Sequence, residues 1–258
     1  MATLKHSERK CLTSFLLGRK CVYCGHRRFY RTKKGYKKCA YCKKEKSQKR
    51  LKREILVISA FRRQQTALLT SHDTGIPYKA VKRIYDNIRL AIVRICEREA
   101  GKLSGEVELD ESYFGGKRKG KRGRGAAGKS IVFGLLERDG RVYTKVVDDV
   151  SKEILMDVIK RKSRKGSVYY TDQFRSYNSL KRYGKHCTIK HTKEFVRKKR
   201  RSVHINGIEG FWSFAKHGLY NYRGVSQSMF PLYLKEMEYR YNHRNDNLLQ
   251  LLIHLYFA

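Results

Sequence analysis

Hydrophobic residues in the first hundred positions of the chain recur at the spacing of helices. They repeat every three or four residues from Leu51 to Leu69, pause over residues 71–75, and resume after Pro77. Proline suits the first turn of a helix, where its missing N–H leaves no hydrogen bond unmade. The pattern predicts a helix, a short turn containing Gly75, and a second helix. The apolar stripe of the second helix consists of Val81, Ile84, Ile88 and Ile92.

From about residue 105 the spacing changes to that of strands separated by helices. Strands are predicted at residues 105–116, 131–136, 142–147, 167–171 and 187–190. Helices are predicted through residues 154–159, 177–180, 204–217 and 228–241. The predicted order is three strands, a helix, a strand, a helix, a strand and a helix. This is the order of the ribonuclease H-like fold. We therefore expect an α/β domain with a mixed sheet covered by helices.

Charge changes this picture because the chain is strongly basic. It holds 60 Lys and Arg against 23 Asp and Glu, a formal net charge of +37. Residues 1–53 alone hold 19 basic residues and 2 acids, which gives +17. The commonest partner of such a charge is the phosphate backbone of nucleic acid. The contacts expected from the second helix are Lys79, Lys82 and Arg83, and those from two basic loops are Lys117, Arg118, Lys119, Arg122, Arg197, Lys198, Lys199 and Arg200.

Membrane binding is the competing explanation of the charge. Apolar runs such as residues 131–136 fall far short of the roughly 20 residues that a span requires, and no signal peptide is recognisable. We expect a soluble, intracellular, DNA-associated protein, in the bacterial cytoplasm and nucleoid or in the nucleus of a eukaryotic host. Its seven cysteines are then not expected to form structural disulfides.

Four of the cysteines have the spacing of a zinc site. Cys21 and Cys24 form one CxxC pair, and Cys39 and Cys42 form a second pair fourteen residues later. Two such pairs supply four thiolates to a tetrahedral Zn²⁺, and the metal stabilises a segment too short to bury a core. The alternative is four unrelated buried cysteines. Zinc ribbons bind DNA, RNA or proteins, and the basic charge favours DNA. The two helices that follow form a helix-turn-helix or, alternatively, a plain helical hairpin linking two domains.

Three acids fall where the predicted fold brings elements together. Asp110 lies in the first strand, Asp172 follows the fourth, and Glu209 lies on a later helix. Two-metal phosphoryl transfer needs carboxylates that hold two Mg²⁺ or Mn²⁺ ions about 4 Å apart. Asn206 and Lys216 share nearly the same helical face as Glu209, where they are expected to orient a water or sugar and to hold a phosphate. The alternative reading of the acidic strand is that it is solvated and its acids merely offset the charge of nearby lysines. The aromatic residues near Glu209 are expected to pack their helix against the rest of the domain.

Three motifs resemble the signature of DDE transposases, most closely the ISXO-like group of insertion sequences and the related Merlin elements. They are residues 110–116 (DESYFGG), 170–172 (YTD) and 204–216 (HINGIEGFWSFAK), with 36 residues between Asp172 and Glu209. The resemblance implies cutting at terminal inverted repeats and joining of the 3′-OH to target DNA. It implies Asp110, Asp172 and Glu209 as the metal-binding triad, with Glu111 as the rival to Asp110. It also implies an N-terminal zinc ribbon and a homo-oligomer assembled on double-stranded DNA.

The expected organisation has five parts and leaves other functions open. They are a lead-in (1–18), a zinc ribbon (19–47), a helix-turn-helix segment (50–100), a ribonuclease H-like catalytic domain (104–248) and a C-terminal tail (249–258). The alternatives are a DNA-binding regulator without catalysis, a ribonuclease H-like nuclease and an RNA-binding zinc protein. Alanine at one of the three acids separates a regulator, which loses nothing, from a transposase, which keeps DNA affinity and loses cleavage.

Overall fold

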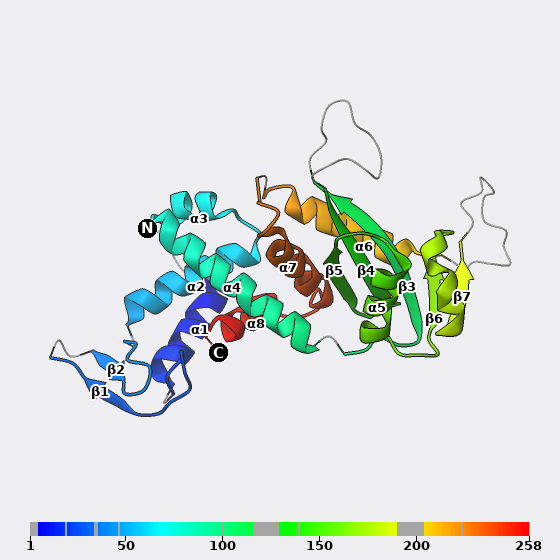
Figure 1. The fold of residues 1–258 in the computed structure, drawn as a ribbon. Helices are drawn as coiled ribbons and strands as arrows, with labels where there is room; N and C mark the ends of the chain where they lie inside the picture. The colour runs from blue at the N-terminus through cyan, green and yellow to red at the C-terminus, as the bar shows by residue number, and fades with distance from the viewer. Residues whose placement is uncertain are drawn as a thin grey trace. The chain divides into compact units, whose positions relative to one another are not determined.

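The computed structural model of the protein has two compact units (Figure 1). It describes residues 5–257 except 19, 34–35, 46, 100, 116–128, 139, 190–203 and 223. The first unit comprises Met1–Ile92 and His243–Ala258, and the second comprises Val93–Asn242. None of the described helices is long and apolar enough to cross a membrane.

The first unit joins a small two-stranded ribbon to a group of helices. Its elements are α1 (His6–Leu17), β1 (Phe29–Arg31), β2 (Lys37–Cys39), α2 (Gln48–Arg62), α3 (Ala67–Thr74), the larger part of α4 (Tyr78–Glu99) and α8 (Leu248–Phe257). Strands β1 and β2 are antiparallel, with Phe29 opposite Cys39. The predicted ribbon and the predicted helices on both sides of Gly75 are therefore present.

The break between the first two helices differs from the expectation. Residues 71–74, expected to be a turn, are helical, and the chain breaks earlier, at Arg63–Thr66 between α2 and α3. The Thr66 hydroxyl accepts a hydrogen bond from Leu69 N–H (3.2 Å) and so starts α3. The buried Thr70 hydroxyl shares a 2.7 Å hydrogen bond with Tyr85 of α4. This contact with α4 favours the helical form of α3, and the turn before α4 is confined to the residues around Gly75 (φ +68°).

The C-terminal residues form a helix where a tail was expected. Helix α8 buries Leu252, 1% exposed, in the first unit. Tyr256 of α8 and Tyr23 of the ribbon both donate to the buried carboxylate of Glu54 on α2, at 3.5 and 2.9 Å. The Tyr23 and Phe257 rings lie 5.5 Å apart. The end of the chain thus stabilises the unit at its beginning.

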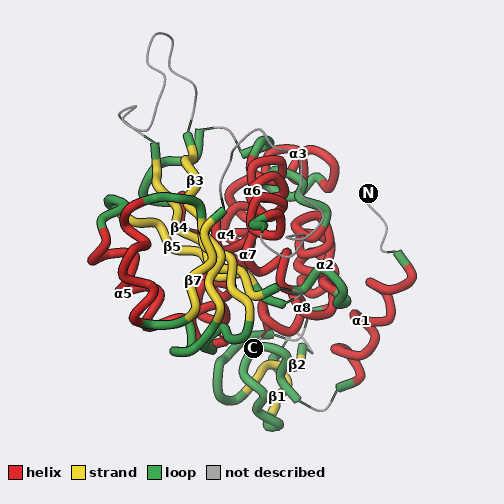
Figure 2. Tube along the Cα trace, turned by 90° about the vertical axis from the view of Figure 1, so that its right-hand side faces the viewer, coloured by secondary structure: helices red, strands yellow, loops and turns green. Residues whose placement is uncertain are grey.

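The second unit is a five-stranded sheet between two helical layers (Figure 2). Its elements are β3 (Glu106–Phe114), β4 (Ser130–Glu137), β5 (Val142–Val147), α5 (Lys152–Lys162), β6 (Val168–Thr171), the 3₁₀ helix η1 (Arg175–Arg182), β7 (Lys185–Thr188), α6 (Asn206–Leu219) and α7 (Phe230–Asn242). The strand order is β5-β4-β3-β6-β7. Strand β4 is antiparallel to both neighbours, and β3, β6 and β7 are parallel. This is the ribonuclease H-like arrangement, which confirms the predicted fold class.

The alternation of residues in β3 explains the two layers. Val107 and Leu109 are fully buried with α5 and η1 on one face of the sheet. The residues that alternate with them, Glu108 and Asp110, face α6 on the other side. That second face holds its own apolar cluster, which includes Phe211 and Trp212 of α6 and Met237 of α7. The central strands are thus covered on both faces, as expected for parallel strands in an α/β domain.

Candidate active site and metal-binding ribbon

The parallel pairing of β3 and β6 brings two of the candidate acids to one level of the sheet. The last paired residues are Glu108 and Tyr170. Asp110 and Asp172 each lie two residues beyond this last pair, Asp110 within β3 and Asp172 directly after the end of β6. Strand β3 continues past Asp110 to Phe114, as the predicted strand over residues 105–116 requires, and beyond Glu108 it is paired with β4 alone. Asp110 therefore lies where β3 loses its β6 partner and one side of its backbone opens.

The third acid approaches the same point from α6. Glu209 lies in the first turn of α6 and is exposed. The pKa of Asp110 is raised from its ordinary 3.8 to about 6, mainly by burial and in part by the charges of Asp172 and Glu209. Both carboxylates are thus close enough to Asp110 to disfavour its ionised form. The structure brings together the three acids that sequence reasoning selected.

Trp212 forms a direct link between α6 and Asp110. Its indole N–H donates a 3.0 Å hydrogen bond to Asp110 Oδ2, and the ring is 5% exposed. Gly134 of β4 lies opposite Asp110 in the sheet, and a Cβ there would lie 2.7 Å from the indole ring. The absence of a side chain at Gly134 therefore lets Trp212 reach Asp110. The sequence predicted packing for the aromatic residues of α6, and the polar role of Trp212 was missed.

Glu108 anchors the start of α6 to the sheet. Its carboxylate is 1% exposed and accepts hydrogen bonds from the Ile208 backbone N–H (2.9 Å) and from Arg138 Nε (3.0 Å). A Cβ at Gly207 would lie 2.8 Å from Glu108 Oε2, so glycine permits this approach. A buried carboxylate at a helix N-terminus satisfies free N–H groups and complements the helix dipole. Glu108 thus fixes the turn of α6 that carries Glu209.

Arg138 connects this anchor to neighbouring strands. It donates to Glu106 Oε2 (3.1 Å) and to the His204 backbone oxygen (2.7 Å). Its guanidinium lies 3.7 Å from the centre of the Tyr170 ring, and the Tyr170 hydroxyl donates to Glu106 (2.6 Å). The signal for this network was present in the sequence. Strand alternation places Glu106, Glu108 and Asp110 on one face, so they could not all be solvated like the acids of an exposed strand.

The remaining predicted residues divide between the site and other surfaces. Glu111 points to the opposite face of β3, where it accepts a hydrogen bond from the buried Tyr177 hydroxyl. Asn206 begins α6 and is exposed. Lys216 lies two helical turns after Glu209 with its ammonium 5.6 Å from the Phe114 ring centre. The geometry therefore separates Glu111 from Asp110 and leaves Asn206 and Lys216 on the helix that carries Glu209.

The acid cluster has the chemistry of a site for hard divalent cations. Asp110, Asp172 and Glu209 offer carboxylate oxygens near a buried strand, and the Phe174 N–H orients Asp172 by donating to its Oδ1 (3.0 Å). Mg²⁺ and Mn²⁺ prefer such oxygen ligands. Among the described residues, only the four cysteines of the ribbon have potential ligand atoms that all lie within 4.8 Å of one another. The potential ligand atoms of the three acids are therefore not all within 4.8 Å of one another.

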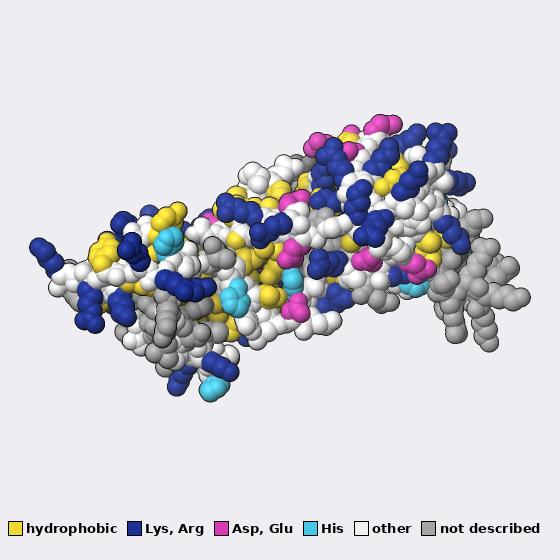
Figure 3. Space-filling view, turned by 90° about the horizontal axis from the view of Figure 1, so that it is seen from below, with side chains coloured by type: hydrophobic (Ala, Val, Ile, Leu, Met, Phe, Trp, Pro, Cys, Tyr) yellow, Lys and Arg dark blue, Asp and Glu magenta, His cyan; other side chains and the backbone are white. Residues whose placement is uncertain are grey.

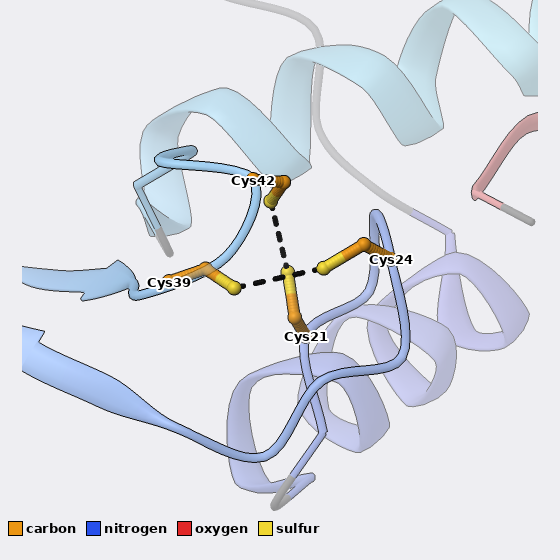
Figure 4. Close-up of side chains that lie close together, drawn as sticks. All are labelled: Cys21, Cys24, Cys39 and Cys42. Carbon is orange, nitrogen blue, oxygen red and sulfur yellow. Dashed lines mark hydrogen bonds between the residues drawn. The ribbon is translucent and has the colours of Figure 1, made fainter.

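The four cysteines of the ribbon converge on one point (Figure 4). Cys21 Sγ lies 3.6 Å from Cys42 Sγ, and Cys24 Sγ lies 3.6 Å from Cys39 Sγ. Tetrahedral ligation with Zn–S bonds of about 2.3 Å requires sulfur atoms about 3.8 Å apart. Each pair is followed by a residue with positive φ, Gly25 (+71°) or Lys43 (+58°), so the two turns are alike. The residues present fit a structural zinc ion.

Basic side chains cover much of the face of the molecule in Figure 3. The three predicted DNA contacts on α4, Lys79, Lys82 and Arg83, are exposed, and Lys82 also pairs with Asp86 (2.5 Å). The predicted contacts in the two basic loops lie outside the described residues. They are Lys117, Arg118, Lys119, Arg122, Arg197, Lys198, Lys199 and Arg200.

Comparison with known proteins finds relatives of the second unit. The model of the family described as ISXO2-like transposase domain matches residues 102–242. A Haemophilus influenzae protein described as an uncharacterized transposase-like protein is 40% identical over 103 residues, which are 40% of this chain and 81% of that protein.

Two solved structures show partial likeness to the chain. The catalytic core domain of BIV integrase is 12% identical with a TM-score of 0.34, over 51% of this chain and 80% of that one. The pre-cleavage Mos1 transpososome is 13% identical with a TM-score of 0.30, over 76% of each chain. The fold is defined by the strand order and layers described above.

Proposed function

This chain belongs to the family of ISXO2-like transposases, and from that premise we propose that it cuts DNA at the ends of a mobile element and joins the freed 3′-OH to target DNA. The observation that supports the proposal is the strand order, in which β3 with Asp110 lies beside β6, which Asp172 follows, while α6 with Glu209 is bonded to Asp110 through Trp212. The alternatives are a regulator that only binds DNA and a ribonuclease H-like nuclease.

The residues of the site have separate roles in this proposal. Asp110, Asp172 and Glu209 would together hold divalent cations, which would supply activation of an attacking oxygen and stabilisation of a leaving oxygen. Trp212 holds Asp110 Oδ2 in place by its 3.0 Å hydrogen bond. Lys216 binds a DNA phosphate, and Asn206 orients a water or a sugar from the first turn of α6. Asp110 must be ionised to bind a cation, which favours activity above about pH 6.

The first unit supplies recognition of the element ends. We assign a structural zinc to the cysteine cluster and DNA contacts to the ribbon and to α4. Metal analysis should find one zinc ion per chain, lost in Cys39→Ser and retained in the control Cys187→Ser, since Cys187 lies in β7. Arg83→Gln should weaken end binding and lower the slope of its salt dependence by about 1, because one phosphate contact is lost. If the slope of the salt dependence were unchanged, α4 would not be part of the DNA-binding surface.

Two DNA ends must be held together for transposition, so we propose a homo-oligomer assembled on double-stranded DNA. The protein then acts wherever the element resides, in a bacterial nucleoid or a eukaryotic nucleus. Light scattering of the purified complex with end DNA should give at least two chains per complex, and a single chain bound to one end during cleavage would contradict this assembly.

The decisive experiment measures strand cleavage on duplex DNA that carries the ends of the element encoding this chain. Mg²⁺ or Mn²⁺ should support cuts at the ends, and EDTA should prevent them. Glu209→Ala should bind the ends and fail to cut. Glu153→Ala is the matched control, because Glu153 is an exposed acid in the first turn of α5, and it should cut normally. Tight end binding without cleavage under either metal would favour the regulator.

A further inference from the structure

A cavity of about 480 Å³ lies in the second unit where β3 and α6 both end. Sites for small molecules commonly have volumes of about 300–1,000 Å³, so this cavity has room for a group of nucleobase size. Six of its eleven lining residues are aromatic, in a chain that is 12% aromatic. They are Tyr113, Phe114, Tyr220, Tyr222, Phe230 and Tyr233.

Pairs of rings form the walls of the cavity. Phe114 and Phe230 have ring centres 5.4 Å apart, and those of Tyr222 and Tyr233 are 5.2 Å apart. Tyr220, at the end of α6, is 63% exposed although it lines the cavity. Its large exposed ring distinguishes the mouth of this cavity from an ordinary gap in the core. Aromatic rings arranged in this way bind flat, apolar-faced groups by stacking.

A ring contact and strand β3 link the cavity to the candidate active site. Trp212, which donates to Asp110, has its ring centre 6.0 Å from that of Phe114 in the cavity wall. Phe114 lies four residues after Asp110 on β3, which is about 13 Å along an extended strand. A DNA strand advances about 3.4 Å per nucleotide in a duplex. The cavity is therefore within about four nucleotides of a phosphate held at Asp110.

The charge at the cavity fits a group attached to a phosphate backbone. Lys216 is the cation among the lining residues, and none of these described residues is acidic. A cationic ligand is therefore disfavoured, whereas a base flanked by phosphates meets both the rings and the ammonium. Bases inside a duplex have both faces covered by their neighbours, so only an unstacked base can enter.

We propose that the cavity receives an unpaired nucleobase of the DNA end that the candidate active site cuts, which rests on the proposed function. The aromatic walls stack on the base, and Lys216 contacts the adjoining backbone. Extraction of this base holds the strand near Asp110 and opens the duplex beside the cut. Tyr220 is then a positioning residue for the DNA, acting through the base and not on the reacting phosphate.

The test uses three forms of the full chain and two forms of the end DNA. Tyr220→Phe keeps the ring, and Tyr220→Leu removes it at a position so exposed that folding should be preserved. On intact ends, Tyr220→Leu should cut about 5- to 150-fold more slowly than wild type, the range expected for one lost base–aromatic stack, and Tyr220→Phe should cut normally. An abasic nucleotide is then placed at each of the last six positions of either strand in turn. At one of these positions the abasic nucleotide should abolish the difference in cleavage rate between Tyr220→Leu and Tyr220→Phe, because the base that stacks on the ring is then missing.

Crosslinking locates the base independently of catalysis. End DNA carrying 5-iododeoxyuridine at that same position should crosslink to a cavity residue in the Glu209→Ala protein. The inference is overturned if wild type cuts the ends while Tyr220→Leu and Tyr220→Phe cut equally fast, or if their difference persists at every abasic position. It is also overturned if the bound DNA crosslinks only outside the cavity. By contrast, wild type that binds and never cuts would refute the proposed function itself.

Discussion

Asp110 is a carboxylate whose surroundings disfavour its charge. Burial is the main cause of its raised pKa of about 6, the Trp212 hydrogen bond lowers the pKa, and the neighbouring acids raise it. Between about pH 4 and 6 the folded protein holds a proton that the unfolded chain has released. Folding is therefore favoured by this residue at low pH, and that contribution is lost as the pH rises through about 6. Above that pH, a divalent cation would compensate for the negative charge of the ionised Asp110 carboxylate.

Asp110→Asn should stabilise the metal-free protein at pH 7.5. The amide keeps an acceptor for Trp212 and removes the disfavoured charge, so the free energy of unfolding should rise by about 1–3 kcal/mol. The gain should shrink at pH 5, and added Mg²⁺ should no longer stabilise the variant. Urea unfolding followed by fluorescence measures this directly, because Trp212 is the single tryptophan of the chain. Asp157→Asn, an exposed acid on α5, is the control. A loss of stability in Asp110→Asn at pH 7.5 would contradict this account.

Gly134 is the second residue on which the site depends. Gly134→Ala places a methyl group 2.7 Å from the Trp212 ring, so the indole must move away from Asp110. Overpacking of this kind should cost about 1–3 kcal/mol, shift the Trp212 emission and slow DNA cleavage. Gly210→Ala is the control on α6, where a Cβ meets nothing within 4 Å. It should stabilise the helix by about 0.5–1 kcal/mol. If Gly134→Ala and Gly210→Ala changed stability and cleavage equally, the close approach of the Trp212 ring to Gly134 would be unimportant for the site.

At the scale of elements, α6 depends on the sheet for its position. Its first turn carries Glu209, and that turn is tied to β3 by Glu108 and to the end of β4 by Arg138, which binds the His204 oxygen. Glu209, Trp212 and Lys216 thus all lie on this one helix. Any loosening of its start should affect catalysis before it affects the fold.

Glu108→Gln should loosen the first turn of α6. It removes the buried charge that accepts from Ile208 and Arg138, and breaking a buried ion pair costs up to about 3–5 kcal/mol. Hydrogen exchange at the amides of residues 207–210 should accelerate more than exchange in the second half of α6. Glu106→Gln also loses a bond to Arg138, but the Glu106 side chain is 49% exposed, so it is the matched control. If hydrogen exchange at residues 207–210 were equally fast in Glu108→Gln and Glu106→Gln, Glu108 would have no special role in holding the first turn of α6.

At the scale of the whole molecule, the chain forms two compact units and its last helix belongs to the first of them. Leu252→Ala opens a cavity among buried residues of α8, and should destabilise the first unit by about 2–5 kcal/mol. The effect should extend to α2 and to the ribbon, because Glu54 binds both Tyr256 and Tyr23.

Hydrogen exchange in α2 and zinc retention measure that effect. Trp212 fluorescence should remain unchanged, since Trp212 belongs to the second unit. Gln250→Ala, on the exposed side of α8, is the control. Destabilisation of the sheet in place of α2 would contradict the assignment of α8 to the first unit.

The sequence by itself determined the order of elements in the second unit, the cysteine cluster and the choice of candidate acids. These features are local, because strand and helix periodicity, CxxC turns and short motifs are each written within a few residues. The different partners of the acids in the acidic strand β3 could not be predicted from the sequence in the same way. Asp110, Glu108 and Glu111 are near neighbours in sequence, yet one faces Trp212, one caps α6 and one meets Tyr177.

Only the tertiary structure decided which partners these residues have. The bonds from Trp212 to Asp110 and from Ile208 to Glu108 join residues about a hundred positions apart, and they exist because α6 packs on β3 across two glycines. The helix at the C-terminus and the aromatic cavity have the same origin. An apolar or aromatic residue is equally compatible with core, surface or pocket until its neighbours are fixed. The sequence therefore determined which groups are available, and packing between distant elements decided where their charge and hydrogen bonds are used.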